Sequence, residues 1–227
     1  MADRRDEIVK KATELFARRG FEATTIREIA TAVNILSGSL YHHFGTKEDI
    51  LHGAVTPAME QLHSRTIEVG KAVADPEAKL AAFVLLELAE QIQNYSAHAV
   101  LYNERKLFRR KEEFAHIHRA KRDIYDAWRS VLIEGIEQGL FDPSLDLYQT
   151  IRTIIRMLNS AADWFAGGDE TIAGMVQNYT LAQVQEFYLR FILGAVRTPA
   201  RAAEPILRDE AARLLSEYAA DLEPAVS

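Results

Sequence analysis

The side chains with the clearest binding chemistry lie in residues 25–44, TIREIATAVNILSGSLYHHF. On a helix that turns about 100° per residue, one face of the second half carries Gly38 and His42, flanked by Ser39 and Tyr41. Small, polar and aromatic side chains of this kind can meet base edges and phosphates in a DNA major groove. A glycine also lets the backbone approach a ligand surface closely. We therefore predict that this face contacts double-stranded DNA.

The sequence contains no comparable pattern for catalysis or metal binding. The sequence has no HExxH, Walker loop, GxSxG or dinucleotide fingerprint. His116 and His118 are two residues apart, so on a helix they diverge by about 200° and cannot share a metal ion. The absence of cysteine excludes disulfides, thiolate metal sites and a cysteine nucleophile. We predict no enzyme, no catalytic residue, no metal site and no cofactor.

Two short helices and a tight turn must position the DNA-facing side chains. Thr25 followed three residues later by Glu28 is the signature of a capping box at a helix start. Asn34 falls at the turn and tolerates the left-handed conformation. A second helix is predicted from about Leu36 to Phe44, with Leu36, Leu40 and Phe44 on its inner side. The first helix presents one apolar face, formed by Ile26, Ile29, Ala30 and Val33.

Together, TTIREIA, the turn at Asn34, GSLYHHF and the following GTKEDIL resemble the helix-turn-helix of TetR-type transcriptional regulators. The sequence departs from that pattern at Leu36, where a capping Ser or Thr is usual, and at Asn34, where Gly is common. We predict that Tyr41 and His42 contact DNA, with Lys47 near a phosphate at the start of the next helix. The full predicted DNA-binding set is Thr25, Arg27, Ser37, Gly38, Ser39, Tyr41, His42 and Lys47.

The chain reads as all helix, with a three-helix DNA-binding domain over residues 1–52 and a helical regulatory and dimerisation domain over residues 53–227. The helix-turn-helix core is residues 25–44. The fourth helix is expected to begin at Thr46 and run on without a linker, although Pro57 lies within it. The fourth helix is expected to run to about residue 70, and Asp75 and Pro76 open the next one. Capping and periodicity predict the other helices over residues 3–19, 96–107, 112–138, 146–165, 170–178, 180–194 and 206–220.

Composition sets further bounds. With 227 residues and a hydrophobic share of 48%, the chain can bury a substantial core. Its charged start and the lack of a long apolar run predict a cytoplasmic protein without a membrane span. The net charge is −6, and residues 1–50 hold eight basic and eight acidic side chains. This balance is a caution, because a basic stripe is the usual footprint of a nucleic-acid binder.

A basic segment does occur later, where residues 104–122 hold eight basic and three acidic side chains. One interpretation is a site for an anionic ligand such as a coenzyme A thioester, and the other is a solvated face paired with acidic neighbours. Aromatic side chains of the central helices could line a hydrophobic pocket or simply form the core. The predicted pocket set is Phe83, Tyr102, Arg105, Phe108, Arg109, Trp128 and Trp164.

The TetR resemblance implies a homodimer, usually a repressor that a small hydrophobic effector releases from a palindromic operator. Within the TetR family, the sequence resembles more narrowly the actinobacterial regulators of lipid or sterol catabolism that respond to acyl-CoA compounds. The predicted interface residues are Ile151, Ile155, Leu158, Phe187 and Phe191. Two alternative functions remain open: a DNA-binding protein that needs no ligand, and a helical-bundle enzyme or carrier. A large apolar cavity in the C-terminal domain speaks against the first, and binding to the gene's own upstream DNA speaks against the second.

Overall fold

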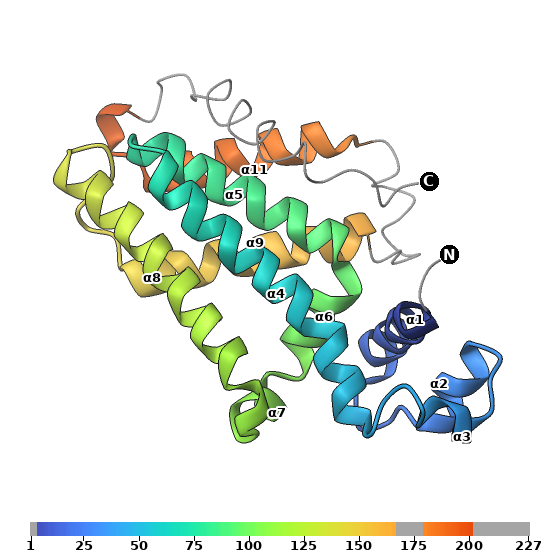
Figure 1. Ribbon diagram of the computed structural model, residues 1–227. Helices are drawn as coiled ribbons and strands as arrows, with labels where there is room; N and C mark the ends of the chain where they lie inside the picture. The colour runs from blue at the N-terminus through green and yellow to red at the C-terminus, as the bar shows by residue number, and fades with distance from the viewer. Residues whose placement is uncertain (1–3, 167–178, 202–227) are drawn as a thin grey trace. The chain divides into compact units, whose positions relative to one another are not determined.

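The computed structural model describes residues 4–166 and 179–201, except for the side chains of residues 163–166. Within these ranges the chain forms helices and no strand, which confirms the predicted all-helical fold (Figure 1). The expected helices over 170–178 and 206–220 lie outside the described residues. The helices are α1 Arg4–Arg19, α2 Ile26–Ala32, α3 Ser37–Leu40, α4 Lys47–Ala72, α5 Pro76–Gln93, α6 Tyr95–Asn103, α7 Arg105–Arg110, η1 Glu112–Phe114, α8 Ala115–Glu137, α9 Leu147–Ala166, α11 Leu181–Val196 and η2 Pro199–Arg201.

The chain divides into two compact units that do not follow a single cut in the sequence. The first unit takes residues 1–61 and 94–121, and the second takes 62–93 and 122–227. Helices α4 and α8 therefore contribute residues to both units. The predicted domain boundary at 52/53 stays a prediction.

The first unit is built on α1, which packs against α2 and α6. One apolar stripe of α1 is buried, since Ile8, Ala12 and Phe16 are fully covered. Gly20 ends the helix in the left-handed conformation with φ +85°, a backbone geometry that glycine adopts without strain. Phe21 then folds back, and its ring meets the Phe16 ring edge-on at 5.2 Å between centroids.

The stretch predicted as one helix over 96–107 is instead two helices, α6 and α7, separated at Glu104. The backbone N–H of Phe21 donates to Glu104 Oε1 at 2.8 Å. The carboxylate thus accepts a hydrogen bond from the backbone of the loop between α1 and α2, 83 residues away in sequence. A local pattern cannot reveal this long-range contact, which lies where the chain leaves one helix and starts the next.

A buried histidine lies within the first unit, on α6. His98 is 5% exposed, and its Nε2 has no hydrogen-bond partner among the described residues. Burial, and secondarily the charge of Lys121, lowers the pKa of His98 from 6.5 to about 4. The folded state therefore holds this histidine neutral over a pH range in which the unfolded chain binds a proton.

We expect His98 to make the protein acid-sensitive. The stability that comes from the neutral ring is fully present above the unfolded pKa of 6.5 and is lost as the pH falls towards the folded pKa of about 4. Between about pH 7.5 and about pH 5, wild type should lose about 2 kcal/mol more than His98→Leu. Urea unfolding at both pH values measures this difference. A His118→Leu control, at an exposed position on α8, should lose as much as wild type; equal losses in all three proteins would remove His98 as the cause.

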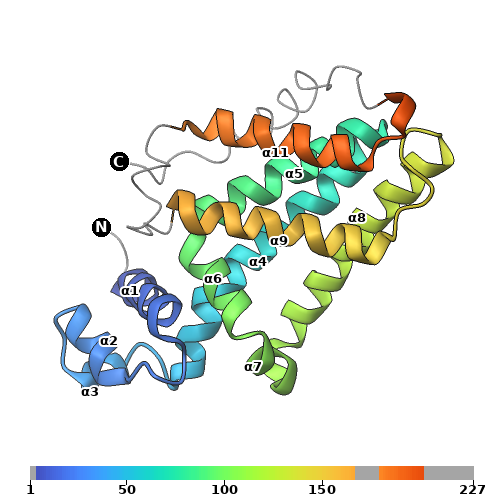
Figure 2. The same ribbon diagram turned by 180° about the vertical axis from the view of Figure 1, so that it is seen from behind.

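The second unit is organised around α5, which is buried over most of its length. Helices α9 and α11 both pack on it (Figure 2). At the end of α8, Phe141 lies directly over Gly135, where a Cβ atom would come within 2.0 Å of the ring, so only glycine fits. The adjoining backbone pairs with the end of α11, since Asp142 N donates to Val196 O at 2.9 Å. Beside it, Arg197 forms a buried ion pair with Glu77 at the start of α5.

No helix among the described residues is long and apolar enough to cross a membrane.

Candidate nucleic-acid interface

The predicted capping box is present at the start of α2. Glu28 N donates to Thr25 Oγ1 at 3.2 Å, and Thr25 N donates to Glu28 Oε2 at 2.8 Å. The backbone bond from Thr25 is the main reason that the pKa of Glu28 lies below its ordinary value. The Thr25 hydroxyl also donates to the same carboxylate at 2.9 Å, so a phosphate contact by Thr25 has to compete with this internal bond.

The turn that follows takes the predicted left-handed form at Asn34, with φ 55°. The second helix is shorter than predicted, with a regular α3 of four residues followed by a turn through residues 41–43. Leu36 does not join the inner face: it is 79% exposed, whereas Leu40 and Phe44 are buried. The reason is that Leu36 is the N-cap, with φ −74° and ψ 145°, so its extended backbone falls outside the helical register.

The reading face, which is the helix face predicted to contact DNA, is open to solvent. Tyr41 is 56% exposed, and His42, Gly38 and Arg27 are exposed as well. A Cβ atom added at Gly38 would meet nothing within 4 Å, so the chain's own packing does not require glycine there. A glycine that the fold does not need, on an exposed helix face, is consistent with close approach of another molecule. Ser37 and Ser39 are half-buried beside it.

Lys47 has a role that the sequence did not reveal. Its Nζ donates to the carbonyl oxygens of Phe21 at 2.9 Å and Thr24 at 3.1 Å, and lies 4.3 Å from the centre of the Phe21 ring. The ammonium group thus holds the loop between α1 and α2 against the start of α4. Its predicted contact with a DNA phosphate remains a prediction, and it would have to share the charge with these carbonyls.

Arg5 is a further residue that sequence reasoning missed. Its Nη1 donates to the carbonyl oxygen of His43 at 2.7 Å, and its guanidinium lies 4.1 Å from the centre of the Phe44 ring. These contacts fix the end of the reading segment to α1. The stacked pair of a cation and an aromatic ring, 39 residues apart, has no local sequence signal.

The residues predicted for a ligand pocket fall into two groups. Tyr102, Arg105, Phe108 and Arg109 belong to the first unit, and Phe83 and Trp128 to the second. Phe83 and Trp128 are buried against each other, with ring centres 5.5 Å apart. In the first unit Phe108 is buried and meets Phe114 at 5.0 Å, while Tyr102, Arg105 and Arg109 are exposed. The side chain of Trp164 lies outside the described residues.

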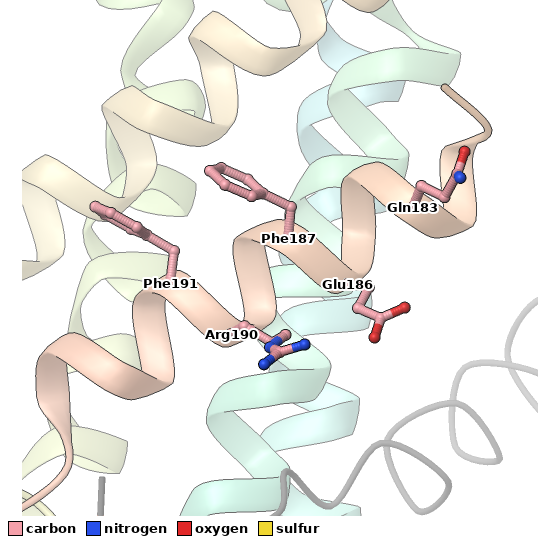
Figure 3. Close-up of a pocket in the computed structure, with 5 residues that line it drawn as sticks. All are labelled: Gln183, Glu186, Phe187, Arg190 and Phe191. Carbon is pink, nitrogen blue, oxygen red and sulfur yellow. The ribbon is translucent and has the colours of Figure 1, made fainter. Parts of the chain in front are cut away.

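The residues predicted for a dimer interface also separate. Ile151 and Leu158 are fully buried within one chain's own core, where they offer no surface to a partner, and Ile155 is half-buried. Phe187 and Phe191 on α11 are 60% and 53% exposed. They project from the same side of the helix and border an open surface depression, with Glu186 and Arg190 on the neighbouring side (Figure 3).

This fold and this exposed face define an all-helical, helix-turn-helix DNA-binding protein. Comparison with known proteins agrees. Residues 8–54 match the family model described as bacterial regulatory proteins, tetR family, and residues 73–196 match the one described as tetracyclin repressor-like, C-terminal domain. The chain belongs to the TetR family of bacterial transcriptional regulators, which confirms the resemblance seen in the sequence.

Three comparisons with individual proteins add detail. The HTH-type transcriptional repressor KstR2 of Mycobacterium tuberculosis H37Rv is 31% identical over 194 residues, which are 85% of this chain and 92% of that protein. A structure of M. tuberculosis KstR2, described as a ketosteroid transcriptional regulator, has a TM-score of 0.78 at 28% identity and covers 87% of this chain and 97% of that one. AibR, solved in complex with isovaleryl coenzyme A and operator DNA, has a TM-score of 0.67 at 20% identity over 86% and 98% of the two chains. KstR2 is a transcriptional repressor by name, in agreement with the non-enzymatic prediction, and AibR shares the fold.

Proposed function

We propose that the protein is a dimeric repressor that binds a palindromic operator through Tyr41 and His42 and is released by a small hydrophobic effector. The observation that carries the DNA-binding part is the exposed face around Gly38, where the fold itself has no need for glycine. The exposed Tyr41 and His42 side chains flank this glycine, and a phenol and an imidazole can both hydrogen-bond to base edges.

We expect Tyr41→Ala and His42→Ala to weaken operator binding by about 1–3 kcal/mol each where the side chain contacts a base edge. A gel shift with the DNA upstream of the protein's own gene measures the effect. Both positions are exposed, so the helical content and the unfolding midpoint should stay at wild-type values.

Leu36 offers the matched control for this test. It is also exposed and lies beside α3, yet it is not in the predicted contact set. Its replacement by Ala should leave affinity closer to wild type than either Tyr41→Ala or His42→Ala. If both of those variants are folded and bind as wild type does, the assignment of the reading face is wrong.

We propose the two-fold dimer because a palindromic operator requires a symmetric reader. The surface that supports it is the pair Phe187 and Phe191, whose rings lie 6.0 Å apart and nearly parallel. Large apolar groups exposed one helical turn apart are typical of a helix face that a partner covers. Glu186 and Arg190, of opposite charge and one turn apart, border this apolar face.

For the effector, a coenzyme A thioester with a hydrophobic acyl group is the first class to test. Its support is that KstR2, a relative that matches 85% of this chain, is named a repressor and described as a ketosteroid regulator. AibR shares only the fold at this level of identity, and shows that such a fold accommodates a coenzyme A thioester with operator DNA. Phe83 and Trp128 are the proposed apolar wall in the second unit. Because α4 contributes residues to both units, we propose that it transmits the effect of binding.

The test is a titration of thioesters with short, branched and polycyclic acyl groups against a preformed complex with upstream DNA. Release by a thioester, but not by free coenzyme A, is the expected result. By linkage, operator DNA should then weaken thioester binding by the same factor, typically about 5–150-fold. If no acyl chain causes release, the thioester proposal fails, and a regulator that needs no ligand becomes the better description.

A further inference from the structure

The basic side chains of the helix-turn-helix region are mostly already engaged within the chain. Four are paired with carboxylates: Arg4 with Glu7, Lys11 and Arg18 with Glu14, and Arg19 with Glu28. Arg5 and Lys47 donate to backbone carbonyls. Because an adjacent carboxylate cancels most of a cation's field, this region offers little net positive charge to a polyanion.

Helix α7 shows the opposite pattern. Its six residues, RKLFRR, hold four cations and no acid. At about 100° per residue, Arg105, Lys106, Arg109 and Arg110 occupy one arc of about 140°, while Leu107 and Phe108 lie on the other side. Phe108 is buried against Phe114 and anchors the helix, so the four exposed cations face solvent. The side chains of Lys106, Arg109 and Arg110 form no hydrogen bond or ion pair with another described residue. Arg105 Nη1 donates to the carbonyl oxygen of Tyr102 at 3.3 Å, within the same segment.

Both ends of α7 are tied to the helix-turn-helix within the first unit. At its start, Glu104 accepts the backbone N–H of Phe21 in the loop between α1 and α2. At its end, Lys111 Nζ pairs with Glu48 in the first turn of α4 at 2.6 Å. That ion pair lowers the pKa of Glu48 and raises the pKa of Lys111. Helix α7 and the pair α2–α3 accordingly lie on either side of the beginning of α4 (Figures 1 and 2).

We propose that Arg105, Lys106, Arg109 and Arg110 form a second DNA-binding surface, the α7 surface, which contacts backbone phosphates beside the region read by α3. The inference rests on the proposed DNA-binding function. Phosphate contacts by Arg and Lys supply much of the affinity for DNA and fix the protein's register without reading sequence. The α7 surface thus provides the positive charge that the helix-turn-helix region has neutralised. It is a different use of these cations from the effector contact that the sequence suggested for Arg105 and Arg109.

The experiment compares full-length wild type with Arg109→Gln/Arg110→Gln on α7. Each protein is titrated with the upstream duplex and with a duplex of arbitrary sequence, between about 50 and 200 mM salt. For each bound protomer, the plot of log affinity against log salt should be less steep in the variant by about 1 to 2, or about one per lost phosphate contact. The loss of affinity should be similar for both duplexes, because phosphates carry no sequence information.

Two controls make the test specific. Arg122→Gln/Arg129→Gln removes the same charge from exposed positions of α8 in the second unit and should keep the wild-type slope. Arg109→Lys/Arg110→Lys keeps the charge on α7 and should restore most of the slope. Thermal unfolding confirms that each variant is folded.

The outcomes separate this inference from the proposed function. If all variants have equal slopes while Tyr41→Ala still binds the upstream duplex more weakly than wild type, the α7 surface is overturned. The assignment of the reading face then still stands. An unchanged slope together with lost release by thioesters assigns these cations to the effector's phosphates instead. If wild type binds neither duplex, both the proposed function and the α7 surface fall.

Discussion

Replacing Glu77 with Ala is expected to destabilise the second unit by about 3–5 kcal/mol, because it removes the carboxylate that pairs with the buried guanidinium of Arg197. Both side chains of the pair are only 2% exposed. Arg197 Nε donates to Glu77 Oε2 at 3.0 Å, and its Nη2 donates to Oε1, which gives a two-pronged contact. Urea unfolding followed by circular dichroism measures the loss, which should be many times larger than that of a surface substitution.

The matched control removes both charges together. Glu77→Leu/Arg197→Met should recover most of the loss, because an apolar pair of similar volume does not leave a buried charge behind. The exposed pair Arg4 and Glu7 gives the surface comparison, since Glu7→Ala should cost no more than about 1 kcal/mol. A Glu77→Ala variant as stable as wild type would show that water or another group reaches Arg197.

The local signals in the sequence predicted the local structure well. The capping box at Thr25 joins residues three apart, so a short pattern contains all the information it needs. Gly20 and Asn34 take the left-handed conformations that their residue types favour. The family resemblance rests on the same kind of short-range spacing.

The parts that could not be predicted depend on contacts between distant residues. Glu77 and Arg197 are 120 residues apart, and each looks like an ordinary surface charge in its own segment. Glu104 was counted among the acids of a basic segment, yet its carboxylate binds the backbone of Phe21. Helical periodicity likewise placed Leu36 on the inner face, because the pattern did not show that the helix starts one residue later.

The charge count shows the same limit. The formal net charge of residues 1–50 is zero, but this count does not show which cations already form contacts within the chain. Only the structure shows that Lys47 holds a loop while the α7 cations face solvent. The contribution of a cation to DNA binding depends on the groups around it in space, and a count of basic residues does not show these groups.

Phe191→Glu is expected to convert the proposed dimer to monomers and to weaken operator binding by about 10²–10⁴-fold, the range over which two linked binding events exceed one. A two-fold interface on α11 would bury Phe187 and Phe191 from both chains, and each ring contributes about 1.5–3 kcal/mol when it is fully covered. Introducing a carboxylate at the centre of this surface would bury a charge in the interface, and the desolvation of that charge opposes association. Because Phe191 is 53% exposed in the single chain, the variant should still fold. Sedimentation at micromolar concentration measures the association, with Ser130→Glu on an exposed position of α8 as the control for added charge. Phe191→Leu, which keeps the position apolar, should remain largely dimeric. A wild type that sediments as a monomer, or a Phe191→Glu variant that stays dimeric, would falsify the assignment of this interface, and operator binding would then require another pairing surface.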